Sequence, residues 1–389
     1  MRRTFRIAMV AACPFPYPRG TPVRIYRMAE TLARRGHDVH VITYHLGEAP
    51  QQVPFTIHRT PPIKTYQRTA PGPSYLKLLI LNPLLAVKVS QVLRRHDIQL
   101  IHAHHYEGLL VARLAQLWHK PPLVYDAHTL LESELPFYGL GLPKEVKRGL
   151  GRWLDRVLPK QATHITTVTE VIRRKLIHNA KVAPEQVTMV SNGVEWEQFA
   201  TAPEGQSGAR RGQKTLVFSG NLASYQRIDL LLKAFREVLN QRQDVRLRII
   251  SDSPFDWYET LVNTLKIQEH IDLLRSDFED LPQLLAAADV ALNPRTECDG
   301  IPLKLLNYMA AGKAIVSFEG SAKGLKHRET GWVVENENTS GFSRAILHLL
   351  ENPRLAQSLG MNARQRVMSE HTWEKTAERC EAVYQQLCR

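Results

Sequence analysis

The chain has 389 residues, 43% hydrophobic and 23% charged, and carries 51 Lys and Arg against 38 Asp and Glu, a net charge of +13 at pH 7. This composition excludes a disordered, collagen-like or coiled-coil chain and predicts two or three globular domains. All of the excess charge lies in residues 1–190, which hold 27 basic and 12 acidic residues, whereas residues 191–389 hold 24 and 26. The asymmetry favours a polyanionic partner for the first half; charge that only keeps the chain in solution is the alternative.

Strands and helices alternate through both halves, a rhythm that predicts parallel sheets covered by helices. Residues 1–12 carry three arginines, but their apolar run is short, so they predict a first strand and not a signal peptide. In the first half, the predicted strands are 5–12, 38–44, 100–103, 123–127, 165–168 and 187–190. The predicted helices there are 74–95, 106–118 and 24–35, the last of which ends at Gly36, and further helices lie between the strands 123–127, 165–168 and 187–190.

The polar stretch 192–214, which contains several Gly and Pro residues, breaks this pattern and predicts a domain linker. Beyond it, the predicted strands are 216–220, 245–251, 290–294 and 314–318. The predicted helices are 228–240, 281–288, 302–311 and a tail from 353 that breaks near His371. We therefore expect an α/β protein with two doubly wound domains, which bind ligands at the carboxyl ends of their strands.

The loop after the first strand is a candidate anion site. Residues 13–22 run straight into a helix, and Gly20 allows backbone amides to approach a ligand at the helix start. The loop lacks the GxGxxG pattern, so it does not predict a bound dinucleotide. A loop stiffened by its prolines is the alternative.

A second candidate anion site lies in the second half. Gly220 closes a predicted strand, and a later strand is followed by a turn at Gly300 and a helix that opens at Pro302. Lys304 in the first turn of that helix opposes the helix dipole, which favours an anionic ligand beside it. An exposed lysine on a capped helix is the alternative.

Seven segments in a fixed order resemble a known family over nearly the whole chain. They read RRGHDVHVIT, IHAHH, VYDAH, VSNGVEWEQF, VFSGNL, DLPQLLAAADVALNP and GIPLKLLNYMAAG. In this order they resemble the retaining glycosyltransferases of family 4, group 1 type, which have the GT-B fold. The resemblance implies two Rossmann-like domains that face a central cleft. Residues 1–194, rejoined by a last helix at 372–389, would bind the acceptor, and residues 195–371 would bind the donor.

The same resemblance assigns residues to the nucleotide-sugar donor. His128 would contact the donor sugar, and Arg227 and Lys304 would stabilise the departing diphosphate, so these three carry the catalytic roles. A histidine satisfied within the core is the alternative for His128. The donor-binding roles, with Gly20 beside the diphosphate, fall on Gly20, Gly220, Asn221, Glu297, Asp299, Gly300, Ile301 and Asn307.

One departure from the family pattern concerns two acidic residues. The family's paired glutamates, one near the sugar hydroxyls and one on the ribose, fall at Asp299 and Asn307. Glu297 could substitute for the first of them. An amide at Asn307 can still bond a ribose hydroxyl, but as a weaker, neutral acceptor.

A second departure concerns the diphosphate. The Arg and Lys that clamp it in the family fall at Asn221 and Gln226, so we expect Arg227 and Lys304 to replace them. These departures leave the donor open, and they make a relative without catalytic activity an alternative.

The reaction that we expect is transfer of a hexose, with retention, from a UDP- or GDP-sugar to a hydroxyl acceptor in cell-envelope glycan, glycolipid or exopolysaccharide assembly. It needs no cofactor and no metal, because Arg227, Lys304 and the amides of the Gly300 turn supply the positive potential. The alternatives are a sugar-nucleotide-binding subunit without catalysis and a nucleotide-sugar 2-epimerase.

Metal ions and nucleic acids are not predicted as ligands. Strand alternation separates His105 from His102 and His104, and no carboxylate is spaced to complete a metal site with them. A nucleic-acid binder would interleave aromatic with basic residues, which this chain does not do. Four scattered cysteines without a CxxC pair predict neither a disulfide framework nor a zinc site.

The stretch 143–160 predicts an amphipathic helix that could touch an anionic membrane. Val146, Leu150 and Trp153 share one face. The basic residues for the lipid surface are Lys144, Arg148, Arg152 and Arg156. We expect a cytoplasmic protein, peripheral on the inner face of the cell membrane, with a saccharide or lipid-linked acceptor. A covering helix whose apolar face packs inward is the alternative.

Overall fold

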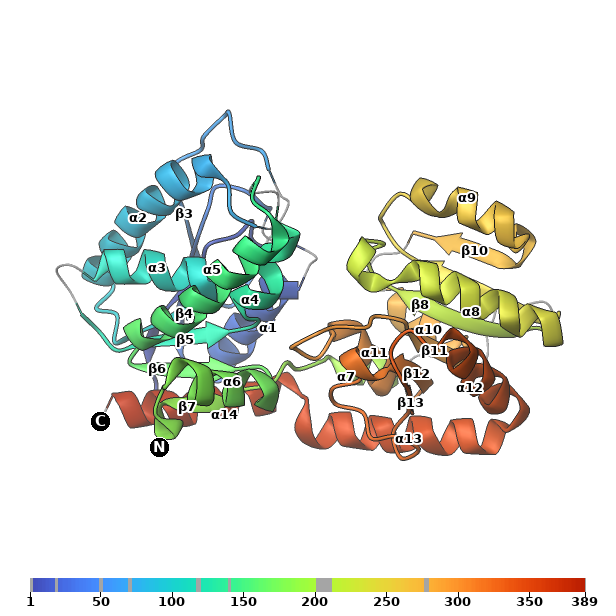
Figure 1. Cartoon of the computed structure of the whole chain (residues 1–389). Helices are drawn as coiled ribbons and strands as arrows, with labels where there is room; N and C mark the ends of the chain where they lie inside the picture. Colours follow the sequence, from blue (N-terminus) through green and yellow to red (C-terminus); the bar gives the residue numbers. More distant parts are fainter. Residues whose placement is uncertain are drawn as a thin grey trace. The chain divides into compact units, whose positions relative to one another are not determined.

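The computed structural model describes residues 3–17, 20–48, 52–68, 72–116, 120–138, 141–200, 212–275 and 280–388. The chain forms two compact units, Met1–Gly193 together with Trp373–Arg389, and Val194–Thr372. Each unit is a parallel β-sheet with helices on both faces, which confirms the predicted α/β class with two Rossmann-like domains (Figure 1). Among the described helices, none has both the length and the apolar character needed to cross a bilayer.

The first unit has seven strands in the order β3-β2-β1-β4-β5-β6-β7. They are β1 Arg6–Ala11, β2 Asp38–Thr43, β3 Thr56–Arg59, β4 Leu100–His104, β5 Leu123–Ala127, β6 His164–Thr167 and β7 Val187–Met189. The central strands are buried on both faces, as the Val, Ile and Ala of parallel sheets require. The order reverses between β1 and β4, which places a ligand-binding switch point at the carboxyl ends of these strands.

The helices of the first unit alternate with these strands. They are α1 Gly20–Arg34, α2 Asn82–Arg95, α3 His105–Ala115, α4 Leu131–Glu134, α5 Lys144–Val157, α6 Glu170–Ala180 and α14 Trp373–Leu387. A π-helical turn, Lys77–Leu81, precedes α2. Short 3₁₀ turns lie at Leu135–Phe137, Pro159–Gln161 and Pro184–Gln186.

The last helix of the chain completes the core of the first unit. Cys380 Sγ of α14 lies 4.0 Å from Met28 Sδ of α1, in a cluster that covers one face of the sheet. Glu381 of α14 accepts hydrogen bonds of 2.7 and 2.9 Å from the guanidinium of Arg35. Helices α2 and α3 cover the opposite face. The predicted return of the last helix to the first domain is therefore confirmed.

The second unit has six strands in the order β10-β9-β8-β11-β12-β13, with its switch point between β8 and β11. They are β8 Lys214–Ser219, β9 Val245–Ile250, β10 Ile271–Leu274, β11 Val290–Asn293, β12 Ala314–Phe318 and β13 Trp332–Val334. The helices are α7 Trp196–Ala200, α8 Ile228–Gln241, α9 Asp256–Leu265, α10 Leu281–Ala286, α11 Leu303–Ala310, α12 Thr339–Glu351 and α13 Pro353–Glu370. Further 3₁₀ turns lie at Ser224–Gln226, Gln268–His270 and Glu319–Ser321.

The structure contains edge strands and helices that the sequence did not predict, and it differs in the linker. The strands β3, β10 and β13 and the helices α9 and α12 were not predicted. These three strands have three or four residues each at sheet edges and are largely half-buried, so they lack a long apolar run. The predicted linker begins too early, because Val194 N donates to His371 O at 2.9 Å and α7 follows. Residues 201–211 of that linker lie outside the described residues.

Candidate active site

Lys304 lies at the carboxyl end of β8, at the switch point of the second unit. Its ammonium donates a hydrogen bond of 2.7 Å to Gln226 Oε1 and lies 3.9 Å from the centroid of the Phe218 ring. Gly220 has φ +129°, and a Cβ there would come within 3.2 Å of Lys304 Nζ. Glycine at this position therefore allows the lysine to pack on the strand end.

Arg295, in the loop after β11, is a second cation that the sequence analysis did not identify. Its Cζ lies 4.8 Å from the centroid of the Tyr225 ring, and its Nε donates to the carbonyl of Glu297 at 2.6 Å. Asn221 Nδ2 donates to Tyr225 Oη at 2.8 Å and so supports the aromatic ring. In the sequence, Arg295 could have been found as a basic residue two positions after the end of the buried strand β11.

Charge around these two cations is unbalanced among the described residues. Neither Lys304 nor Arg295 forms an ion pair with a carboxylate in the part of the chain that the structure describes. The pKa of Lys304 lies well below its usual value, because burial disfavours the ammonium and because Arg295 adds positive charge nearby. A bound anion would relieve both effects, so the arrangement is suited to a phosphate or carboxylate group.

Arg227 is placed differently from the sequence expectation. Its Nε donates to Asp229 Oδ1 at 3.1 Å, and its Nη1 donates to Glu337 Oε1 at 2.5 Å. Its backbone is left-handed at φ +55°, directly before α8. The structure therefore pairs Arg227 with two carboxylates and records no contact between it and Lys304.

The other predicted donor residues surround the start of α11. Gly300 and Ile301 are buried in the turn before the helix, whereas Glu297 is exposed and Asp299 is half-buried. Asn307 follows Lys304 by three residues and so lies on the same face of α11. Its half-buried amide makes no hydrogen bond with any described residue, which leaves it available to a ligand.

In the first unit, Asp126 at the end of β5 is the centre of a buried hydrogen-bond network. Arg24 donates to both of its carboxylate oxygens, at 2.8 and 3.0 Å, and Thr166 Oγ1 donates at 2.8 Å. The rings of His104 and His128 lie 3.0 and 2.7 Å from Asp126 Oδ2. Burial alone would raise the pKa of Asp126, but Arg24 and the two histidines hold it well below its usual value.

His128 therefore has partners on both ring nitrogens. Its Nε2 faces Asp126, and its Nδ1 lies 3.2 Å from Thr21 Oγ1 of α1. Burial lowers the pKa of His128 to about 4, so the imidazole is neutral at pH 7. Gly20, beside Thr21, is exposed as the first residue of α1, and nothing lies within 4 Å of a Cβ built on it. The predicted roles of Gly20 and His128 toward the donor stay predictions.

His105 is a further residue of this edge that sequence analysis did not include. It follows β4 with φ +64°, a left-handed conformation that is costly for a residue with a side chain. Its Nε2 lies 3.0 Å from Glu134 Oε2, which also accepts from Tyr138 Oη at 2.9 Å. Burial raises the pKa of Glu134, but its interaction with His105 and the hydrogen bonds from His105 and Tyr138 outweigh this and lower the pKa to about 2.

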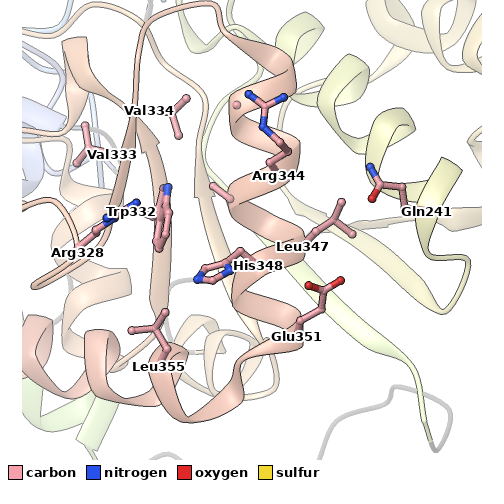
Figure 2. Close-up of a pocket in the computed structure, with 12 residues that line it drawn as sticks. Gln241, Arg328, Trp332, Val333, Val334, Arg344, Leu347, His348, Glu351 and Leu355 are labelled. Atoms are coloured by element: carbon pink, nitrogen blue, oxygen red, sulfur yellow. The ribbon is translucent and has the colours of Figure 1, made fainter.

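A pocket of about 880 Å³ lies elsewhere in the second unit (Figure 2). It opens between β13 and α12, where Arg328 lies 4.9 Å from the Trp332 ring and His348 flanks the same ring. None of the predicted site residues lines this pocket. The chemistry described above therefore belongs to the strand ends and not to this pocket.

Comparisons with known proteins agree with this architecture. The family profile "Glycosyltransferase Family 4" matches residues 18–198, and the profile "Glycosyl transferases group 1" matches residues 213–352. N-acetyl-alpha-D-glucosaminyl L-malate synthase of Bacillus anthracis is 23% identical over 389 residues, which cover 96% of each chain.

Solved structures of similar fold cover the whole chain. Sucrose-phosphate synthase of Thermosynechococcus elongatus has a TM-score of 0.83 at 18% identity, over 98% of both chains. Anabaena Alr3699/HepE, solved in complex with UDP and glucose, has a TM-score of 0.75 at 16% identity, over 98% of this chain and 100% of that one. The two profile matches show that the chain is a glycosyltransferase of family 4, group 1 type, and the similar structures show that it has the GT-B fold.

Proposed function

We propose that the enzyme transfers a hexose from a UDP- or GDP-sugar to a hydroxyl acceptor, with retention and without a metal ion or cofactor. The bond between the anomeric carbon and the diphosphate oxygen breaks, and the acceptor oxygen bonds to that carbon on the same face. The acceptor proton passes to the departing phosphate. Negative charge develops on the diphosphate, and fixed positive groups lower the barrier by stabilising it.

The observation that carries this proposal is the pair of cations at the carboxyl ends of β8 and β11. Lys304 and Arg295 have no acidic partner in the described chain, and Gly220 leaves room for the lysine at the strand end. Two preorganised cations can do at the diphosphate what a divalent cation does in metal-dependent enzymes. UDP in the HepE structure supports a uridine nucleotide as the first donor to test.

The experiment is nucleotide binding followed by product analysis. We expect UDP or GDP to raise the free energy of unfolding by about 2.7 kcal/mol at a hundredfold excess over its Kd, equally in EDTA and in Mg²⁺. The anomeric coupling constant of the product, measured by NMR, reports retention. Binding that requires Mg²⁺ contradicts metal independence, and no response to any nucleoside diphosphate contradicts the donor assignment.

The first unit supports an acceptor at a lipid surface. In α5, Gly151 faces inward, because a Cβ there would collide with the backbone of Leu131. Val146, Leu150, Trp153 and Val157 lie on the outer side of the helix, where Trp153 is 57% exposed, whereas Leu154 packs against the core. If α5 only covered the sheet, its apolar side chains would be buried against the core and its polar side chains would be exposed. We therefore propose that α5 lies against an anionic membrane and that the product belongs to a cell-envelope glycan.

The basic residues of α5 do not contribute equally to that surface. Arg152 donates to Glu132 Oε1 at 2.8 and 2.7 Å, and Arg148 lies 3.6 Å from Glu145. Lys144 and Arg156 have no acidic partner among the described residues. These two therefore offer the most charge to anionic lipid headgroups.

A sugar-nucleotide-binding subunit without catalysis is the second candidate. It is favoured by Asn307, an amide at the place where the family has a carboxylate. Product analysis separates the two, because a binding subunit gives nucleotide stabilisation without turnover on any acceptor.

A further inference from the structure

Three histidines from separate segments meet at the sheet edge of the first unit. His40 lies in β2, His58 in the edge strand β3, and His96 directly after α2. Their ring centroids are 4.4 to 5.2 Å apart. One nitrogen from each ring lies within 4.8 Å of the others. Only the fold reveals this cluster, because the three residues are far apart in the sequence.

The closest pair has the geometry of two nitrogens that share one proton. His40 Nδ1 lies 2.9 Å from His58 Nε2. The other nitrogen of His40, Nε2, lies 3.2 Å from Asp38 Oδ1, although it makes no well-directed hydrogen bond with any described residue. His40 itself is only 3% exposed. A proton on Nε2 facing Asp38 leaves the Nδ1 lone pair directed at His58, as in sites where a carboxylate orients a metal-bound histidine.

We propose that His40, His58 and His96 bind one Zn²⁺ ion, with a water molecule as the fourth ligand. Two nitrogens at about 2.0–2.1 Å from a tetrahedral zinc lie roughly 3.4 Å apart, a value between the 2.9 Å of the closest pair and the 4.8 Å that encloses all three. The ion takes the place of the shared proton after small rotations of the rings. His96 can make such a rotation because its ring has no hydrogen-bond partner among the described residues.

The surrounding charges fit a neutral imidazole set beside one carboxylate. Lys88 acts electrostatically on His58, and Asp38 Oδ1 lies 3.2 Å from His40 Nε2. Lys88 opposes a cation at this place and Asp38 favours one. The ion would join β2, the edge strand β3 and the end of α2, and β3 is otherwise only partly buried.

A second cluster in the same unit is less suited to a cation. His102, His104 and Asp126 also lie within 4.8 Å of one another. Asp126, however, is already paired with Arg24 at 2.8 Å, so an incoming cation would face a buried guanidinium. This difference allows the test to separate the two clusters.

The test uses the full chain, stripped of metal with EDTA and titrated with ZnCl₂ by calorimetry. We expect one Zn²⁺ per chain, a rise in the midpoint of thermal unfolding, and no such response to Mg²⁺, which prefers oxygen ligands. Substitution with Co²⁺ should give the visible absorption of a nitrogen-ligated tetrahedral ion. The rise in midpoint is measured without donor or acceptor, so it does not depend on the proposed transfer reaction.

Two variants locate the ion. His96→Gln alters a ring that makes no hydrogen bond with any described residue and should weaken Zn²⁺ binding at least tenfold while the fold is kept, and adding His58→Gln should abolish it. The matched control is His178→Gln, an exposed histidine of α6, which should bind as the unaltered chain does. Undiminished binding in the double variant, equal loss in the control, or no binding by the unaltered chain would each overturn the proposal.

Discussion

At the scale of single residues, the charge of Lys304 and Arg295 is the feature with the clearest effect on turnover. Lys304→Ala and Arg295→Ala should each lower kcat by about 10²–10³-fold, because each removes a positive group from the developing diphosphate. Lys326→Ala is the control, since Lys326 is exposed and paired with Glu329 at 3.0 Å. Steady-state kinetics with the native donor measure the effect.

Arg227 provides the contrasting variant. Because Asp229 and Glu337 already neutralise its guanidinium, Arg227→Ala should lower kcat by much less than Lys304→Ala. If the two losses are equal, Arg227 reaches the diphosphate as the sequence resemblance implies, and its pairing with the carboxylates is not its functional state.

Asn307 tests the ribose. Asn307→Glu restores the carboxylate that the family has at this position, and a carboxylate bonds hydroxyls more strongly than an amide does. The affinity for the nucleoside diphosphate should change by about 1 kcal/mol, either through the stronger bond or through repulsion of the diphosphate. Calorimetric titration measures it, and an unchanged Kd would place Asn307 outside the site.

His128 makes stability depend on pH in a defined window. Its pKa is about 4 in the folded chain and near 6.5 in the unfolded chain, so below pH 6.5 the unfolded chain takes up about one more proton at this residue. The free energy of unfolding should therefore fall as the pH falls from 6.5 to 4. His128→Gln should make this fall less steep in urea titrations at several pH values. An unaltered slope would show that His128 is protonated in the folded chain.

Lys304, Arg295 and Arg227 differ in how much of their surroundings the sequence predicts. Lys304 was predicted because a lysine in the first turn of a helix is locally unfavourable, and that signal lies within one short segment. Arg295 was missed because its importance depends on Tyr225, which lies about seventy positions away in another loop. The role of Arg227 at the diphosphate stays a prediction, and sequence position does not show that Asp229 and Glu337 surround its guanidinium.

At the scale of elements, the long buried strands were predictable and the sheet edges were not. Strands such as β5 and β12 match their predicted bounds, because five buried residues in a row give an unambiguous apolar run. The start of α1 was placed four residues too late, since 20–23 contains a Gly and a Pro that usually belong to loops. Helices tolerate both residues in their first turn.

The exposed apolar side of α5 leads to a prediction about membranes. The full chain should co-sediment with anionic vesicles at low salt and be released at high salt. Leu150→Ser with Trp153→Ser should weaken this binding about tenfold or more, because both side chains are exposed and apolar. Val171→Ser, at an exposed apolar residue of α6, is the control. Equal recovery with neutral and anionic vesicles would exclude an electrostatic lipid surface.

At the scale of the whole molecule, the first unit needs the last helix of the chain, whereas the second unit is one continuous stretch. Truncation after Thr372 removes α14 from the first unit and leaves the second unit whole. It exposes the cluster around Met28 and leaves Arg35 without Glu381. We expect the first unit to unfold or to be cleaved rapidly in limited proteolysis, while a fragment that corresponds to the second unit, Val194–Thr372, resists. Equal protease resistance of both units would contradict a structural role for α14.

The position of α14 also has a consequence for the order of events during synthesis. The first 193 residues leave the ribosome first, but one face of their sheet is only partly covered, by α1, until the last helix has been made. The second unit, Val194–Thr372, needs no later residues and can reach its native packing earlier. Nascent chains of this protein therefore carry a partly uncovered apolar sheet face for most of translation, which makes the unfinished N-terminal unit the segment that a chaperone would have to protect.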